Sequence, residues 1–171
     1  MKFSISFKII FFLLLFNTYN SNGQDKPKII NPGKSVGSLL LGQTTLIILK
    51  DTLKIRDYDI TKDKEELTKR KFILYYVILH DSGYEGISFD IYSNKKNPIK
   101  EIYVTDKCNA QTVNGIIVGK SNFKDVYDVY GIPDITKKNV VKYILKGIDF
   151  ISDSTNIIKE IVIYQPIMKR F

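Results

Sequence analysis

The sequence predicts an α+β fold in which two tandem helix–three-strand repeats form one curved antiparallel sheet with the helices on one face. Three observations predict it: blocks of the first half recur in order in the second half, an apolar pattern with helical spacing follows the first block of each half, and an alternating pattern follows each helix. The predicted repeats span residues 32–105 and 113–165 of a single domain, 24–171, and residues 105–112 are the predicted linker.

Three blocks carry the internal repeat. Each block starts with the same glycine or isoleucine in both halves and continues with identical or chemically similar residues. Chance rarely repeats three such blocks in the same order. The aligned pairs are Gly42 with Gly119, Gly86-Ile-Ser-Phe with Gly147-Ile-Asp-Phe, and Ile99-Lys-Glu-Ile with Ile158-Lys-Glu-Ile.

The first 23 residues are predicted to be a cleavable secretory signal peptide. Lys2 and Lys8 supply positive charge, residues 9–16 form an unbroken apolar run, and small residues precede the expected cut after Gly23. The run is about half of the ~20 residues that a membrane-spanning helix needs, which disfavours a permanent anchor. No cysteine lies near the cut to carry a lipid. We therefore expect an exported protein, periplasmic or secreted, that is not lipid-anchored.

In the second repeat, a helix is expected to begin at the cap residue Ser121. Gly131 can adopt the left-handed conformation that ends a helix, and Pro133 prevents its continuation. Between these signals, one helical face is apolar, consisting of Phe123, Val126, Tyr127 and Tyr130.

In the first repeat, the expected cap is Thr44, and the expected apolar face consists of Leu46, Leu49 and Leu53. The exit of this helix is less sharply specified, because Lys54 stands where the second repeat has a glycine. A short additional helix is expected over residues 63–70, where Glu66 and Arg70 have the spacing of a helical ion pair.

Alternating apolar and polar residues predict three strands after each helix. Short turns between them predict antiparallel neighbours. The expected strands cover residues 71–79, 87–92, 101–104, 140–145, 148–152 and 157–164. The residues expected to face the helices are Ile87, Phe89, Ile102, Val104, Ile148, Phe150, Ile161 and Ile163.

The formal net charge of +8 comes from basic residues that are spread along the chain, which is typical of a solvated surface. A sharper interpretation is an anionic membrane surface or an acidic partner, whereas predicted export argues against nucleic acid. Cys108 is the only cysteine, so no internal disulfide is possible. It is expected to be a small buried residue or else a thiol that pairs between molecules.

Few residues point to catalysis. His80 is the only histidine, which excludes a site with several histidine ligands, and His80-Asp81-Ser82 favours a turn over a hydrolytic triad, whose members are assembled in space. The Gly-Lys-Ser triplets at Gly33 and Gly119 lack the spacing of a phosphate loop. We expect no cofactor and no metal, and we expect a non-enzyme, with a small hydrolase of unrecognised site as the catalytic alternative. The carboxylate pairs expected on the surface are Asp57 with Asp59, Asp125 with Asp128, and Asp149 with Asp153.

Strand alternation places tyrosines on the sheet face opposite the predicted helices, where a one-sided sheet normally carries polar residues. Tyrosine combines a large contact area with a polar tip, as binding surfaces do. The alternative is that the rings cover one another or pack beneath a loop. The predicted partner-binding residues are Tyr75, Tyr92, Tyr103 and Tyr164, with Tyr76 as the alternative to Tyr75.

The segment from Gly119-Lys-Ser to Tyr130-Gly-Ile-Pro133 resembles the helix motif of the BamE (SmpA/OmlA) family of outer-membrane assembly factors. Two such units in tandem, each followed by antiparallel strands, resemble the beta-lactamase-inhibitor protein family. The resemblance covers residues 32–165 and implies a concave sheet face that binds a protein, with no catalytic residues. The first copy lacks the Gly-x-Pro ending, and the lipid-attachment cysteine of the BamE type is missing.

We therefore expect a non-catalytic, inhibitor-like binding module that holds another protein or peptide on its tyrosine-bearing sheet face. The alternative is a structural or assembly component of the bacterial cell envelope, which would engage membrane proteins and an anionic membrane surface through its basic residues.

Overall fold

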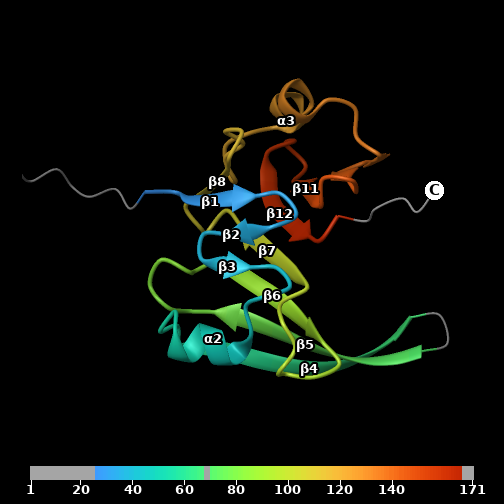
Figure 1. The fold of residues 1–171 in the computed structure, drawn as a ribbon. Coiled ribbons are helices and arrows are strands. Elements are labelled where there is room, and N and C mark those ends of the chain that lie inside the picture. Colours follow the sequence, from blue (N-terminus) through green and yellow to red (C-terminus); the bar gives the residue numbers. More distant parts are fainter. Residues whose placement is uncertain (1–25, 68–69, 167–171) are drawn as a thin grey trace, which may run out of the picture.

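The computed structural model of the protein describes residues 26–67 and 70–166 (Figure 1). The predicted signal peptide lies outside these residues. Within them, no helix combines the length and the apolar character needed to cross a membrane.

The main element is an eight-stranded sheet in the order β4-β5-β6-β7-β12-β11-β10-β9, in which all neighbouring strands are antiparallel. Its strands are β4 (Tyr58–Leu67), β5 (Arg70–Leu79), β6 (Ile87–Tyr92), β7 (Glu101–Thr105), β9 (Ile135–Lys137), β10 (Val140–Tyr143), β11 (Ile148–Ser152) and β12 (Ile158–Tyr164). We call it the large sheet.

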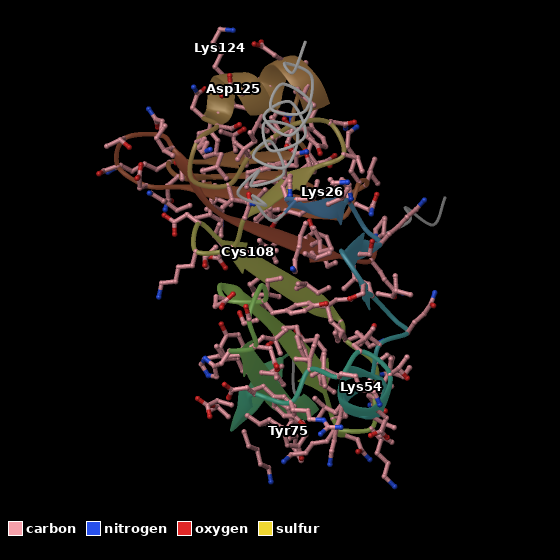
Figure 2. All side chains as sticks on the ribbon, turned by 90° about the vertical axis from the view of Figure 1, so that its left-hand side faces the viewer. Lys26, Lys54, Tyr75, Cys108, Lys124 and Asp125 are labelled. Atoms are coloured by element: carbon pink, nitrogen blue, oxygen red, sulfur yellow. The ribbon has the colours of Figure 1, made fainter. Side chains whose placement is uncertain are left out.

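A second, small sheet has the order β3-β2-β1-β8, and in it β1 and β8 are parallel. Its strands are β1 (Lys28–Asn31), β2 (Ser35–Val36), β3 (Leu39–Leu40) and β8 (Ala110–Thr112). The two helices are α2 (Leu46–Asp51) and α3 (Phe123–Tyr130). In Figure 1 the small sheet lies in front of the large one, with α2 below it and α3 above it. In the perpendicular view of Figure 2, β1–β3 and α2 lie to one side of the large sheet.

The predicted fold class is therefore wrong: the chain is mostly β, with two sheets and two short helices, and it is not an α+β repeat with helices on one face of one sheet. The helices of six and eight residues are too short to cover eight strands. The small sheet packs on the large one, and buried residues of both helices join the same core. Its strand β1 precedes the first predicted repeat, β2 and β3 lie in the expected helix entry, and β8 lies within the predicted linker, 105–112.

The eight strand residues expected to face the helices are buried on one side of the large sheet, but they pack largely against the small sheet and not beneath a layer of helices. All eight are at most 1% exposed, and they form the core together with residues such as Ile30 and Leu39 of the small sheet. We call this side of the large sheet the covered face. Burial of this apolar surface is the main source of the protein's stability.

The two predicted repeats make the same hydrogen bonds at aligned positions. Three hydrogen bonds of the first half have counterparts of nearly equal length in the second half. The pairs are Leu40 N to Thr44 Oγ1 (2.9 Å) and Ile117 N to Ser121 Oγ (3.0 Å), Gly42 N to Ile99 O (2.8 Å) and Gly119 N to Ile158 O (2.7 Å), and Ile99 N to Thr44 O (2.8 Å) and Ile158 N to Ser121 O (2.8 Å). The aligned segments therefore occupy equivalent positions in the two halves.

Gly86 and Gly147 show why a glycine recurs in the second block. Both residues have positive φ, +79° and +68°, which side chains other than glycine rarely adopt. A Cβ on Gly147 would collide with the carbonyl oxygen of Tyr164, and one on Gly86 would lie 2.8 Å from the backbone nitrogen of Cys108. Each glycine directly precedes a strand hairpin, β6–β7 or β11–β12, and the two hairpins together form the centre of the large sheet.

The helix caps lie one residue later than predicted. Asn122 caps α3 in a capping box with Asp125, and Thr45 caps α2 by accepting from the backbone N–H of Ile48. Ser121 and Thr44 instead accept from the preceding turns. The predicted C-cap of α3, Gly131, is confirmed.

The helix expected over residues 63–70 is also wrong. Residues 58–67 form β4, and the chain returns as β5 from Arg70, with Glu66 opposite Lys71. Charged residues suit β4 because it is an edge strand, where charges prevent pairing with other chains. Tertiary pairing thus overrides the weak helical preference of these residues.

Candidate functional site

The candidate site is the other side of the large sheet, which we call the open face because no other element of residues 26–67 and 70–166 packs over it (Figure 2). Directly opposite residues of antiparallel strands point to the same side. Two rows of such residues cross the centre of the sheet. One row is Tyr76, Asp90, Glu101 and Tyr164, and the other is Ile78, Ser88, Tyr103, Val162, Asp149 and Lys142.

The open face brings together three of the four predicted tyrosines, Tyr92, Tyr103 and Tyr164. It does not include Tyr75, which lies opposite Ile91 on the covered face and packs against the core. The neighbouring Tyr76, the alternative in the prediction, is on the open face instead.

Tyr103 is the centre of a hydrogen-bond network on the open face. Its hydroxyl donates to Asp90 Oδ2 at 2.7 Å and to Glu101 Oε2 at 3.1 Å, and Asp90 is only 4% exposed. The ring of Tyr103 meets that of Tyr76 edge-on, with centroids 6.0 Å apart. Burial, followed by the hydrogen bond to Asp90, raises the pKa of the Tyr103 hydroxyl well above its usual value. The phenol therefore acts as a fixed donor.

Tyr164 forms a second, similar network. Its hydroxyl donates to Asp149 Oδ1 at 2.6 Å, and the other oxygen of Asp149 accepts from Lys142 Nζ at 2.7 Å. Asp149 is 5% exposed. Burial and the bond to Asp149 raise the pKa of the Tyr164 hydroxyl. A buried carboxylate is stable here because an ammonium group and a phenol both contact it.

The remaining tyrosines of the face are anchored as well. Tyr92 donates to Glu101 Oε1 at 3.4 Å, and the hydroxyl oxygens of Tyr76 and Ser88 lie 2.7 Å apart. The rings thus contact their own neighbours, as the alternative interpretation of the sequence held. Their positions are also fixed before any partner arrives.

Two hollows lie side by side on the open face. The first has a volume of about 660 Å³ and extends over β5, β6, β7, β11 and β12; its lining includes Tyr76, Ile78, Ser88, Thr105, Ile151 and Glu160. The second has a volume of about 650 Å³ and extends towards β9; its lining includes Tyr103, Ile135, Val140, Ile151, Val162 and Tyr164. Ile151 belongs to both and forms the ridge between them.

Other residues considered from the sequence have separate local roles. His80 Nε2 contacts Asp59 Oδ2 at 3.0 Å, and the carboxylate of Asp81 accepts from the backbone N–H groups of Arg56 and Asp57 at 2.7 Å. His80-Asp81-Ser82 is thus a turn and not a triad. In the described part of the chain, no group of three or more acidic, histidine or cysteine side chains is arranged to hold a metal.

The remaining carboxylates of the predicted pairs and the cysteine are also structural. Asp125 belongs to the α3 cap, Asp128 pairs with Lys124, and hydrogen bonds from Thr155 lower the pKa of Asp153. Cys108 is buried, and burial raises the pKa of its thiol, as expected for a small core residue.

Sequence reasoning missed the carboxylates of the open face. Asp149 was expected to be a surface acid, and Asp90, Glu101 and Glu160 were not assigned a role, yet all four lie at central positions of the sheet. The available signal was their alternation with core residues, as in Phe89-Asp-Ile and Ile148-Asp-Phe. An acid flanked by two core residues of a central strand must point to the opposite face.

Comparisons with models of protein families, with curated proteins and with solved structures find no match to this chain. The open face is therefore interpreted from its own chemistry. It offers fixed phenol and carboxylate groups beside two partly apolar hollows, an arrangement suited to contact with another molecule.

Proposed function

We propose that this chain is a non-catalytic binding protein that holds a segment of another protein against the open face of the large sheet. The observation that carries the proposal is the pair of adjoining hollows on a sheet face that no described element covers. Branched and aromatic side chains line both hollows, and such side chains form the centres of protein interfaces.

Hydrogen bonds hold the tyrosines of the open face in place, which supports a binding role. The hydroxyls of Tyr76, Tyr103 and Tyr164 are hydrogen-bonded in the absence of a partner. Binding therefore requires little further ordering of these rings, and the loss of side-chain entropy on association is correspondingly small.

The charge of the open face indicates the chemistry of the partner. The chain carries a formal charge of +8, yet the four central strands present the carboxylates of Asp90, Glu101, Asp149 and Glu160 to the open face. Of these four carboxylates, only Asp149 forms an ion pair with a lysine, Lys142. A segment that combines basic and apolar side chains complements this surface.

The test compares two matched double variants. Ile78 and Ile135 line the two hollows and are 37% and 38% exposed, whereas Ile29 of β1 and Ile48 of α2 are each 37% exposed outside the open face. Serine at Ile78 and Ile135 removes apolar surface from the open face, and serine at Ile29 and Ile48 removes a comparable amount elsewhere. Short random peptides displayed on phage are selected on the parent protein, and binding to each variant is then measured.

We expect selected peptides to be rich in basic and apolar residues and to bind the open-face variant about tenfold more weakly, with the control variant unchanged. Failure to select any peptide, or equal binding to both variants, would contradict the proposal. Binding of the parent to anionic lipid vesicles without peptide binding would favour the cell-envelope alternative instead.

A further inference from the structure

Glu160 is the one carboxylate among the four central ones of the open face that lacks a hydrogen-bond or ion-pair partner in the described part of the chain. It lies on β12 between Thr105 of β7 and Ile151 of β11, and it lines the first hollow. Its side chain is half-buried, and burial raises the pKa of its carboxyl group.

The cations near Glu160 do not neutralise it. Its chain neighbour Lys159 bonds to Asp106 at 2.9 Å and lies 3.8 Å from Asp153. Lys107 lines the same hollow but forms no ion pair with Glu160. A partly buried, unpaired carboxylate is unfavourable, because it loses hydration without gaining a partner. Such a group can be neutralised by a cation that enters the hollow.

We propose that Glu160 receives the guanidinium group of an arginine from the bound protein segment. The proposal rests on the proposed function of the open face and names the side chain that the first hollow recognises. A guanidinium is planar and can donate two parallel hydrogen bonds to one carboxylate. Ile151, which lies opposite Glu160 on β11, lines the same hollow and offers apolar contact to the three methylene groups of the arginine stem.

The partly apolar lining of the first hollow favours arginine over lysine. An ammonium group is more strongly hydrated and loses more on entering a partly apolar hollow.

The test uses two tripeptides that differ in charge and hardly in shape: acetyl-valyl-arginyl-valine amide and the same peptide with citrulline, the neutral counterpart of arginine. Each is titrated into the ¹⁵N-labelled protein and into Glu160→Gln, and the backbone amide shifts of Ser88, Thr105 and Glu160 are followed. We expect the arginine peptide to shift these amides, and the citrulline peptide to bind about tenfold more weakly. In Glu160→Gln the difference between the peptides should disappear.

A control variant, Asp57→Asn, removes an exposed carboxylate outside the hollow and should leave the preference for arginine unchanged. Equal binding of both peptides at the open face would overturn the role of Glu160 and leave the proposed function standing. Absence of shifts at the open face with either peptide would also overturn it, and the phage selection would then decide the proposed function separately.

Discussion

The two faces of the large sheet are built from the same strands but from opposite chemistry. On the covered face, residues such as Phe89, Ile102 and Phe150 are apolar and at most 1% exposed. On the open face, their chain neighbours Asp90, Tyr103 and Asp149 form hydrogen-bonded pairs of phenol and carboxylate. The comparison teaches that alternation along one strand separates two environments: one face forms the apolar core of the fold, and the other presents hydrogen-bonded polar side chains.

The largest effect is expected on the covered face. Phe150 is fully buried, and its ring lies 5.2 Å from that of Tyr130 and 6.1 Å from that of Tyr143. Phe150→Ala should lower the free energy of unfolding by about 3–5 kcal/mol, because it removes apolar contacts and leaves a cavity. Urea denaturation measures this change. A loss below about 1 kcal/mol would mean that the covered face is not the main source of stability.

A smaller effect is expected from the network on the open face. Tyr103→Phe removes one hydroxyl that donates to two carboxylates, and it should cost about 2 kcal/mol of unfolding free energy. Tyr76→Phe, which removes a hydrogen bond between uncharged groups, should cost about half as much. Urea denaturation of both variants gives the ratio. Equal costs would show that the buried carboxylates do not strengthen this network.

The dependence of protein stability on alkaline pH also distinguishes buried from exposed tyrosines. Burial, followed by the neighbouring phenols of Tyr127 and Tyr130, raises the pKa of Tyr143 from 10.0 to about 12. The folded state thus favours the neutral phenol. The resulting stability is fully present below pH 10 and is lost as the pH rises through about 12. Because the pKa values of Tyr103 and Tyr164 are also raised, the late ionisation seen by ultraviolet absorbance of tyrosinate should not vanish in Tyr143→Phe but should be smaller by one phenol. An unchanged titration would contradict the prediction.

The smallest effect is expected at Glu160, and it has the opposite sign. Because burial raises the carboxyl pKa, the folded state favours protonated Glu160, so the ionised form lowers stability at neutral pH. Glu160→Gln should therefore raise the melting temperature by about 1–2 °C at neutral pH, and the gain should vanish in acid. Asp57→Asn is the exposed control. A lower melting temperature for Glu160→Gln would indicate a partner that stabilises the carboxylate.

The sequence was sufficient to predict the covered face but not the element that covers it. Alternation identified the core residues because each central strand is long enough to show a period of two. The small sheet has strands of two to four residues, and it joins β1 to β8 across about eighty positions of the chain. No local pattern encodes such pairing. The charged strand β4 likewise resembles a helix until its partner β5 is known.

The candidate site was predicted in part, for a comparable reason. Alternation placed Tyr92, Tyr103 and Tyr164 on one face, and the structure brings them together there. It did not decide between Tyr75 and Tyr76, because β5 carries apolar residues on both of its sides. Only the pairing of β5 with β6 sets which residues face the core. Of the carboxylate partners, Asp149 was expected to be exposed although it is buried, and Asp90 and Glu101 were assigned no role.

The pairing of β7 with β12 joins the two halves of the chain at the middle of the large sheet. Residues brought together there, such as Thr105 and Glu160, are far apart in the sequence, so their contact requires closure of a long loop and belongs to the slow part of folding. Each half alone would expose an unpaired inner strand. The open face, which spans this junction, is therefore complete only when both halves have folded.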